Sequence, residues 1–453
     1  MAMSLNDIAV CVDGQLQGEN LDITGVGIDT RALKAGDLYI AIRGEQFDGH
    51  DFLAQAEAAG ARAVIVAELM QTALPQIIVK DTRLALAELA AAVREKAQVT
   101  VCAMTGSNGK TTVKEMIAAI LSVQASVLFT AGNFNNEIGV PLTLLRLTEQ
   151  HQYAVIEMGA NHQGEIAYSC QYAKPDVAII NNVGAAHIEG FGSLAGVAQA
   201  KAEIIQALSA DGVAILNADD VFFSQWQALA GERKLISFGL QNSADVTAEN
   251  ISIQLEGLQF KTEFELIANQ QRVLINLGLA GEHNVLNALA ASAACLALGI
   301  ALEQIQQGLQ QVKAVQGRLQ LCASAAGNKI INDTYNANPA SLEVALQVLQ
   351  KCATQRWVVL GAFGELGDDS MQCHRDMGEQ IKQAGVTRLF AVGELAKYSV
   401  KSFGKGADYF STKEELITAL QQAITAEVVI LVKGSRAQKM ETVVNALIGQ
   451  AGN

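Results

Sequence analysis

The segment TVCAMTGSNGKTTVKEMIAAIL, at residues 100–121, contains the residue types best suited to chemistry. The apolar run at 99–104 is typical of a buried strand, and apolar residues at helical spacing begin at Val113. Backbone N–H groups at a helix start hold phosphate oxygens, a lysine adds positive charge, and a threonine hydroxyl can reach Mg²⁺. The segment therefore predicts a nucleotide phosphate site made of Thr105, Gly106, Ser107, Asn108, Gly109, Lys110, Thr111 and Thr112.

This loop is a variant of the usual phosphate-binding loop. The long form has a glycine separated from Gly-Lys by four residues, and Met104 stands at that position here. Gly106 begins a shorter loop instead. An ordinary turn between a strand and a helix, with a chance Gly-Lys-Thr, is the alternative. The strand and helix patterns on either side favour the phosphate site.

Polar side chains also follow the next apolar runs, where each predicted strand ends. Glu157 ends the run YAVIEMG, and the run DVAIINNVGAAHIEGFG leads through Asn181 and Asn182 to His187. Open α/β sheets bind ligands at the carboxyl ends of their strands, so Glu157 and His187 are expected to converge on the phosphate loop. A carboxylate suits Mg²⁺, whereas a histidine is a less usual ligand. Taken alone, either residue could be a cap or a surface group.

Other polar positions are less specific. Lys201, in the helical segment LAGVAQAKAEIIQAL, looks like a solvated helix lysine when judged from its neighbours alone. Asn284 lies at the start of a very apolar helix, Asp333 follows a predicted strand, and Lys433 and Arg436 follow another. Ordinary strand-ending turns and helix caps explain these positions equally well.

The elements needed to position these residues follow a strand-then-helix rhythm. From residue 98 to about 312 this rhythm predicts a mostly parallel sheet covered by helices, after a helical connector at 84–96. Within that region, residues 250–279 alternate apolar and polar, which predicts antiparallel strands appended to the sheet. The rhythm resumes with strands near 329–332, 356–360, 387–392 and 427–432. The fold class is therefore α/β, with about three domains for 453 residues.

Composition excludes several classes of protein. Half of the residues are hydrophobic and 17% are charged, so the chain has enough apolar surface to offset the entropy cost of ordering. The net charge of −14 argues against a nucleic-acid partner, because such a protein needs positive charge to neutralise phosphates. The seven cysteines are scattered and lack CxxC spacing, which predicts a reducing compartment and no disulfide framework or zinc site.

One stretch could be mistaken for a membrane span. Residues 285–302 contain no charged side chain and are long enough to cross a bilayer. The stretch stands alone and contains Asn287, Ser292 and Gly299, so a helix buried in a globular core is the preferred interpretation. The N-terminal MAMSLNDIAV lacks the basic-then-apolar pattern of a signal peptide. We therefore expect a cytoplasmic protein with no membrane insertion.

Eight segments of the chain, in order, resemble the Mur ligase family. They are TGSNGKTT, TAGNFNNEIGVPLTLL, IEMGANHQGEI, NNVGAAHIEGFGS, GEHNVLNALAA, QGRLQ, DTYNANPAS and LVKGSR. The resemblance covers essentially the whole chain and implies three domains. These are a UDP-sugar-binding domain at 1–83, a central ATP-binding P-loop domain at 84–312, and a Rossmann-like domain at 313–453 that closes over the site.

The resemblance also implies an activity. It is strongest to the branch of the family that joins D-alanyl-D-alanine to UDP-N-acetylmuramoyl-tripeptide in peptidoglycan precursor synthesis. In that reaction ATP phosphorylates the substrate's terminal carboxylate, the dipeptide amine attacks the acyl phosphate, and ADP and phosphate are released. ATP and Mg²⁺ are then the expected cofactors, and the two substrates are the expected small-molecule partners.

Residue roles follow from the same resemblance. Lys110, Glu157, His187 and Lys201 are implied as catalytic residues, and Thr111, Glu157, His187 and Lys201 as holding Mg²⁺, with Lys201 carbamylated. Asn284, Arg318 and Asp333 are implied to contact the nucleotide in addition to the loop. The implied substrate-binding residues are Asp29, Thr30, Arg31, His50, Asn136, Asn336, Lys433, Ser435 and Arg436.

The chain departs from the family pattern at one visible position. Ala362, in GAFGELG, stands where an aspartate is expected, although Glu365 remains. No DNPR-like stretch is present, which argues against the sister ligase that adds diaminopimelate. The open alternatives are a related amino-acid ligase of the same family, a P-loop phosphotransferase, and a nucleotide-gated binding protein without chemistry. A monomer is favoured.

Overall fold

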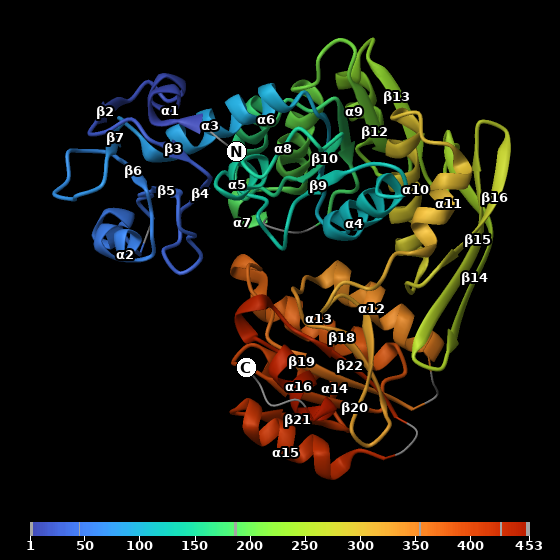
Figure 1. Cartoon of the computed structure of the whole chain (residues 1–453). Coiled ribbons are helices and arrows are strands. Elements are labelled where there is room, and N and C mark those ends of the chain that lie inside the picture. The colour runs from blue at the N-terminus through green and yellow to red at the C-terminus, as the bar shows by residue number, and fades with distance from the viewer. Residues whose placement is uncertain (1–2, 45, 185–187, 353–354, 426–427, 450–453) are drawn as a thin grey trace.

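The computed structural model of the chain describes residues 3–44, 46–184, 188–352, 355–425 and 428–449. These residues form three bodies, each built on its own sheet, which appear in blue, in green to yellow, and in orange to red in Figure 1. The predicted α/β fold is confirmed, with a mostly parallel central sheet, an antiparallel extension and a mostly parallel C-terminal sheet. Among the described residues, no helix is both long and apolar enough to cross a membrane.

The N-terminal body is a small mixed sheet with strand order β2–β7–β6–β5–β4, in which only the β2–β7 pair is antiparallel. Its strands are β2 (Gln15–Gln17), β4 (Gly25–Gly27), β5 (Asp37–Ile40), β6 (Ala63–Val66) and β7 (Gln76–Ile78), with a separate pair β1 (Met3–Ser4) and β3 (Asp22–Ile23). Its helices are α1 (Leu5–Cys11), the 3₁₀ turn η1 (Gly49–Phe52) and α2 (Leu53–Ala58).

The predicted helical connector is α3 (Thr82–Ala97), which leads into the central body. The carboxylate of Asp81 caps its first turn by accepting hydrogen bonds from the amides of Arg83 and Leu84. The helix ends at Gln98, whose φ of 49° is left-handed. These end signals fix where the chain enters the central sheet.

The central sheet has the strand order β16–β15–β14–β13–β12–β11–β8–β10–β9. Its strands are β8 (Thr100–Thr105), β9 (Val127–Phe129), β10 (Tyr153–Glu157), β11 (Val177–Ile180), β12 (Val213–Asn217), β13 (Lys234–Phe238), β14 (Val246–Glu256), β15 (Gln259–Ala268) and β16 (Gln271–Leu277). Its helices are α4 (Lys110–Leu121), α5 (Gly139–Leu144), α6 (Glu165–Ala173), α7 (Ile188–Phe191), α8 (Leu194–Gln206), α9 (Phe223–Ala230), α10 (Glu282–Ala297) and α11 (Leu302–Gln310).

Helices cover both faces of this sheet, so its strands are apolar at successive positions. In β8, Val101 and Ala103 pack into the core that includes α3, α6 and α8, whereas Cys102 and Met104 pack into the core that includes α4 and α10. Successive side chains of a strand point to opposite faces, and both faces are dry here. The continuous apolar run before the phosphate loop follows from this arrangement.

The antiparallel extension lies at one edge of the sheet, as the alternating pattern predicts. β14 pairs with β15 and β15 with β16, forming the long yellow-green ribbon on the right of Figure 1. Alternate residues of β15, among them Phe260, Phe264 and Leu266, are buried. The ribbon belongs to the central body and reaches toward the C-terminal body, so residues of both bodies line a shared cavity there.

The apolar stretch at 285–302 is a buried helix followed by the start of another. α10 ends at Ala297, and Gly299 adopts a φ of 78°, a left-handed conformation that favours glycine and ends the helix. The stretch is therefore interrupted between α10 and α11, whereas composition alone indicates a single uninterrupted apolar segment.

The C-terminal sheet has the order β17–β18–β22–β19–β20–β21, and only the β17–β18 pair is antiparallel. Its strands are β17 (Gln320–Ala323), β18 (Lys329–Asp333), β19 (Arg356–Gly361), β20 (Arg388–Val392), β21 (Ala407–Phe410) and β22 (Val429–Lys433). β18, β19, β20 and β22 lie close to the four predicted positions, whereas β17 and β21 were not predicted. Its helices are α12 (Pro339–Cys352), η2 (Gly367–Asp369), α13 (Ser370–Gln383), α14 (Ala396–Phe403), α15 (Lys413–Ala423), η3 (Arg436–Gln438) and α16 (Glu441–Ile448).

Gly308 offers a direct test of how α11 packs against α4. A methyl group added at Gly308 would stand 2.3 Å from the Cα of Ile120. Gly308→Ala should therefore destabilise the protein by about 1–3 kcal/mol through overpacking. This cost outweighs the gain of up to about 1 kcal/mol that alanine has over glycine in helix propensity.

The measurement is the urea midpoint of the variant relative to the parent chain. Gly278→Ala is the control, since an added methyl there meets its nearest neighbour, the Val312 carbonyl oxygen, at an ordinary 3.6 Å. An unchanged or higher midpoint for Gly308→Ala would show that α11 does not pack so closely on α4.

Candidate active site

The loop between β8 and α4 forms a cradle of backbone groups at a helix start. Gly109 precedes α4 with a φ of 81°, and a methyl group there would lie 2.4 Å from Oδ1 of Asn287. No side chain among the described residues caps α4, and its first helical bond runs from the Val113 amide to the Gly109 carbonyl. The amides at the start of α4 therefore remain available for an anion, which the helix dipole also favours.

The end of β11 holds this loop in place. The Asn182 carbonyl and side-chain oxygen accept hydrogen bonds from the amides of Ser107 (3.0 Å) and Asn108 (2.9 Å). Asn181 Nδ2 donates to the Asn108 carbonyl at 2.9 Å. The two asparagines that the sequence shows at a strand end thus support the loop from the adjacent strand.

Lys110 supplies positive charge within the cradle. Its Nζ donates to the Gly106 carbonyl at 2.7 Å, so the side chain folds back over its own loop. Burial lowers the pKa of the Lys110 ammonium, and the positive charge of Arg318 acts in the same direction. The negative charge of Glu157 opposes both effects. An anion bound in the cradle would favour the charged form of this lysine.

Glu157 and Thr111 form a buried, hydrogen-bonded pair of oxygen-bearing side chains beside the cradle. Thr111 Oγ1 donates to Glu157 Oε2 at 2.9 Å, and Asn135 Nδ2 donates to Glu157 Oε1 at 2.8 Å. The Glu157 amide donates to Thr130 Oγ1 at 3.0 Å. Glu157 ends β10 opposite Met104 of β8, so the strand register places its carboxylate at the start of the loop. The predicted convergence of Lys110, Thr111 and Glu157 on one edge is present in the structure.

Lys201 is not a solvated lysine. It lies in α8 with only 4% of its surface exposed, and it has no hydrogen bond or ion pair with the described residues. Burial lowers its pKa well below the usual value, and the positive charge of Lys110 lowers it further. The amine is therefore held toward its neutral, nucleophilic form. The residue-level expectation of a surface lysine is wrong, because α8 packs on β11 and β8 in the interior of the central sheet. His187 lies outside the described residues.

The C-terminal body contributes groups to the same loop. Arg318 Nη2 donates to Thr111 Oγ1 at 2.9 Å, and its guanidinium lies 4.2 Å from the centroid of the Tyr335 ring. Asn338 Nδ2 donates to Asn108 Oδ1 at 3.0 Å. Within the described part of the chain, Arg318 Nε is buried without a hydrogen-bond partner. Arg318 thus has an N–H group next to the cradle that could donate a further hydrogen bond.

Asp333, which is partly buried, and Lys433, which is fully buried, form an ion pair at the ends of adjacent strands. Lys433 Nζ contacts Asp333 Oδ2 at 2.6 Å and also donates to the Asn336 carbonyl at 3.2 Å. Asp333 Oδ1 accepts from the Leu319 amide at 3.2 Å. β18 and β22 are parallel neighbours with these two residues in register, which explains the pairing. This network connects the turn after β18 with the turn after β22.

Ser435 and Arg436 follow Lys433 in the turn after β22. Ser435 Oγ donates to the Ala362 carbonyl at 2.8 Å, which ties this turn to the loop after β19. Arg436 is largely exposed, forms an ion pair with Glu441 at 3.2 Å, and lies 5.8 Å from the Tyr335 ring centroid. Ala362 itself is buried, so its backbone, and not a carboxylate, provides the contact at this position.

Asn284 is part of a hydrogen-bonded chain at the start of α10. Its Nδ2 donates to the Ala280 carbonyl at 2.7 Å, and its Oδ1 accepts from Asn287 Nδ2 at 3.1 Å. Asn287 Oδ1 in turn accepts from Asn181 Nδ2 at 2.9 Å. Burial lowers the pKa of the neighbouring His283 to about 4, against the opposing effect of Asp333. The head of α10 is thereby linked to the phosphate loop.

The residues predicted to bind substrate in the N-terminal half have local partners. Asp29 and Arg31 form an exposed ion pair at 2.7 Å, in which the Arg31 hydrogen bonds lower the pKa of Asp29 to about 2. Both ring nitrogens of buried His50 are engaged, Nδ1 with Asp48 at 2.6 Å and Nε2 as acceptor from the Ala67 amide at 2.9 Å.

Two further residues of the N-terminal half were predicted to bind substrate. Thr30 stands between Asp29 and Arg31 in the sequence, and Asn136 lies in the central body. Asn136 Oδ1 accepts from the Gly139 amide at 2.9 Å and so stabilises the start of α5. Its neighbour Asn135, which reaches Glu157, is not among the predicted residues. The structure does not bring Asp29, Arg31 or His50 into direct contact with the phosphate loop within the described residues.

The donor set beside the cradle fits a magnesium ion. A carboxylate and a hydroxyl oxygen, buried and 2.9 Å apart, are ligands that Mg²⁺ prefers. The described residues contain no group of three or more His, Cys, Asp or Glu side chains able to hold a metal. The described residues alone therefore provide an incomplete shell, which suits a metal that also binds phosphate oxygens and water.

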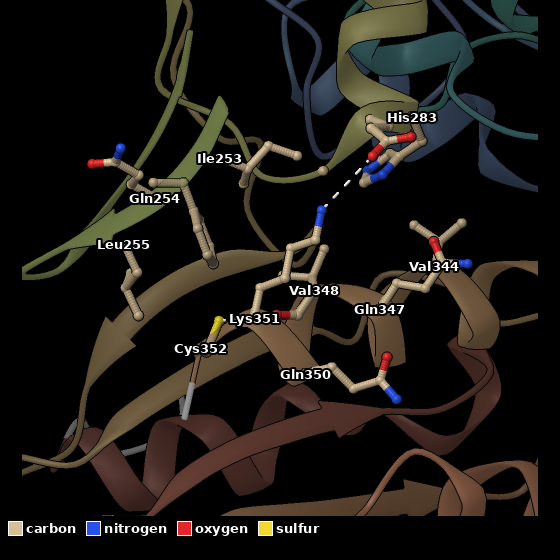
Figure 2. Close-up of a pocket in the computed structure, with 13 residues that line it drawn as sticks. Ile253, Gln254, Leu255, His283, Val344, Gln347, Val348, Gln350, Lys351 and Cys352 are labelled. Carbon is tan, nitrogen blue, oxygen red and sulfur yellow. Dashed lines mark hydrogen bonds and ion pairs between the residues drawn. The ribbon is translucent and has the colours of Figure 1, made fainter. Parts of the chain in front are cut away.

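A separate cavity of about 380 Å³ lies between the ribbon and α12. Figure 2 shows Ile253 and Leu255 of β14 facing Val344, Val348 and Lys351 of α12, with His283 at the top. Lys351 Nζ lies 3.8 Å from a carboxylate oxygen of Glu282 across the two bodies. Residues of the central body and of the C-terminal body both line this cavity, so it lies at the interface between these two bodies.

The sequence prediction missed three residues that contact the site, two asparagines and one tyrosine. Asn135 orients Glu157, Asn338 reaches the phosphate loop, and Tyr335 lies against Arg318. Each sits within one or two positions of a predicted residue, so clustering along the chain is the signal that could have found them. Their partners are distant in sequence, and for that reason single positions could not be selected.

Known proteins that resemble this chain are similar to it from end to end. The chain is 47% identical over 451 residues to the UDP-N-acetylmuramoyl-tripeptide–D-alanyl-D-alanine ligase of Escherichia coli (strain K12), covering 99% of this chain and 98% of that protein. It superposes on a crystal structure of MurF from Acinetobacter baumannii with a TM-score of 0.92, at 39% identity and 99% coverage of both chains. A MurF ligase from Thermotoga maritima, solved in complex with ADP, gives a TM-score of 0.83 at 28% identity, covering 94% and 97% of the two chains.

Family models match three successive parts of the chain. The model of the Mur ligase family catalytic domain matches residues 22–94, that of the Mur ligase middle domain matches 104–295, and that of the Mur ligase glutamate ligase domain matches 317–436. The phosphate loop and Glu157 fall in the second, and Arg318, Asp333 and Lys433 in the third. The chain therefore belongs to the Mur ligase family.

Proposed function

We propose that this protein is an ATP-dependent ligase that joins D-alanyl-D-alanine to UDP-N-acetylmuramoyl-tripeptide in peptidoglycan precursor synthesis. ATP transfers its γ-phosphoryl group to the terminal carboxylate of the tripeptide. The dipeptide amine then forms a bond to the acyl carbon, loses a proton, and phosphate departs. The observation that carries the proposal is the end-to-end similarity, at 47% identity, to a ligase with this named activity.

The phosphate loop has the task of binding and stabilising phosphoryl charge. The free amides at the start of α4 and the Lys110 ammonium would surround the transferring group, since this transfer depends on positioning and electrostatics. The ADP-bound relative supports nucleotide binding in this fold. Arg318, with its unused Nε, would add positive charge from the C-terminal body, and Asp333 and Asn284 would contact the rest of the nucleotide.

Thr111 and Glu157 would hold Mg²⁺, together with His187 and a carbamylated Lys201. The metal, when bound, neutralises charge that develops on the phosphate oxygens. The low pKa of buried Lys201 supports carbamylation, because only a neutral amine attacks CO₂. The product is an anion, which the nearby positive charge of Lys110 would attract and whose oxygens could bind the metal.

The acceptor amine would approach from the C-terminal body. Lys433, Ser435, Arg436 and Asn336 lie in the linked turns after β18 and β22, and the exposed Arg436 guanidinium is available for a carboxylate. Asn136 would lie on the opposite side. Asp29, Thr30, Arg31 and His50 would bind the UDP-sugar, with His50 acting through the loop that it holds.

The proposal also includes the domain boundaries, the oligomeric state and the cellular location of the protein. Boundaries after residues 83 and 312 are supported because the strands of each large sheet fall within one of the three intervals. A monomer is supported because one chain supplies both Thr111 and Arg318 to the site. A cytoplasmic location is supported by the free thiol state of all seven cysteines.

The test of the function is a product assay. The purified protein should release ADP and phosphate only when ATP, UDP-N-acetylmuramoyl-tripeptide and D-alanyl-D-alanine are all present, and mass spectrometry should show the pentapeptide product. Full turnover without the dipeptide would instead indicate a phosphotransferase. A product formed with a single amino acid in place of the dipeptide would indicate a different ligase of the family.

Lys110→Ala should reduce kcat by at least about 100-fold, because it removes a positive donor aimed at the transferring phosphoryl group. Its thermal unfolding should stay close to that of the parent, because Lys110 makes a single hydrogen bond to its own loop. Steady-state rates and thermal melts measure the two effects. Near-normal turnover of this variant would contradict the assigned role.

Lys201→Ala should lose activity by at least about 100-fold, because an anionic ligand is missing. Short carboxylic acids such as acetate should restore part of it by occupying the vacated space, whereas Lys110→Ala should gain nothing from the same acids. Initial rates across an acetate series provide the measurement. If no small acid restores activity, Lys201 does not act through a carbamate.

A further inference from the structure

The loop after β19, residues 362–366, lies directly against the turn after β22, residues 434–438. The Ala362 carbonyl accepts from Ser435 Oγ at 2.8 Å and from the Ser435 amide at 3.4 Å. The Ala362 amide donates to the Val392 carbonyl at 3.1 Å. The position of this loop therefore determines the position of Ser435.

A buried histidine holds the next residue of the loop. His374, in the first turns of α13, is completely buried, and its Nε2 accepts a hydrogen bond from the Phe363 amide at 3.1 Å. Its Nδ1 lies 2.7 Å from the Ser370 carbonyl, which can only accept. The ring must therefore be neutral, with the proton on Nδ1 and a free lone pair on Nε2. Burial, which lowers the pKa of His374, supports this state.

The backbone of His374 is itself fixed from the other side. Ser399 Oγ of α14 donates to the His374 carbonyl at 2.6 Å. A methyl group at Gly378 of α13 would stand 2.2 Å from the Ser399 carbonyl, so the two helices are in close contact. The imidazole is thus a rigid bridge from a helix pair to a loop that contacts the Ser435 turn.

We propose that His374 is a positioning residue for the amine acceptor. Its neutral imidazole holds the Phe363 amide, the loop then fixes Ser435 through Ala362, and the turn presents Ser435 and Arg436 to D-alanyl-D-alanine. This inference rests on the proposed function, because it takes that turn as the acceptor side of the site. Within the described residues, the hydrogen bonds of His374 go to Phe363, Ser370 and Ser399, and none goes to the loop after β8 on the nucleotide side.

Three variants separate positioning from simple stability. His374→Gln can still place an acceptor oxygen near the Phe363 amide, whereas His374→Asn is too short to reach it and retains only a donor for Ser370. Ser399→Ala is the matched control, since it removes an equally buried hydrogen bond to His374 on the side away from the loop. KM for D-alanyl-D-alanine, KM for ATP, kcat and the unfolding midpoint are measured for each variant.

His374→Asn should raise the KM for D-alanyl-D-alanine by about tenfold, the effect expected when a buried N–H loses its acceptor and the loop shifts. The KM for ATP should change less than about twofold, a negligible difference in binding free energy. His374→Gln should recover most of the loss, and Ser399→Ala should lower the unfolding midpoint without changing the dipeptide KM. Equal effects of all three variants, or a normal dipeptide KM in His374→Asn, would overturn the proposal.

Amide hydrogen exchange measures how firmly the loop after β19 is held, and it does not require enzyme turnover. Peptides that cover residues 362–366 should exchange faster in His374→Asn than in His374→Gln or Ser399→Ala. Unchanged exchange in His374→Asn refutes the hydrogen-bonded bridge itself. Faster exchange, with no product from D-alanyl-D-alanine even in the parent chain, would instead refute the proposed function and leave the bridge established.

Discussion

Two buried oxygen atoms stand 2.9 Å apart, in the Thr111 hydroxyl of the first turn of α4 and the Glu157 carboxylate at the end of β10. The arrangement depends on the register of β8 and β10, which sets Glu157 opposite Met104 and thus beside the loop that follows. A buried carboxylate is stable only when hydrogen bonds or positive charges satisfy it, and Thr111 and Asn135 supply such bonds. This requirement accounts for much of the polar network around the phosphate loop.

The C-terminal body also donates hydrogen bonds to this region of the central body. Arg318 donates to Thr111, and Asn338 donates to Asn108, so groups from two separately folded sheets meet on one loop. A site shared between two bodies can respond to their relative movement, and closing of such sites excludes water from the reaction. The cavity between the ribbon and α12 lies on the same border (Figure 2).

At the turn after β22, which we propose to face the acceptor, a backbone carbonyl makes the contact at the position where an aspartate was expected. Ala362 replaces the expected aspartate, and its carbonyl, held by Ser435, links the loop after β19 to the turn after β22. Asp333 and Lys433 then connect that turn to β18. Small residues are required here, since a methyl group at Gly393 would stand 2.9 Å from the Ala362 Cβ. Tight packing of this kind transmits a shift at one loop to the next.

By itself, the sequence determined the α/β fold class, the antiparallel ribbon and the position of the phosphate loop. Each depends on local periodicity, or on residues adjacent in the chain, as with Gly109, Lys110 and Thr111. Tertiary structure alone decided that Lys201 is buried, that Asn135 serves Glu157, and that His374 carries a neutral ring. Asn135 meets Glu157 22 residues away, and the His374 ring meets the Phe363 amide 11 residues away. Burial and charge at these positions, and at Lys201, arise only when the elements pack together.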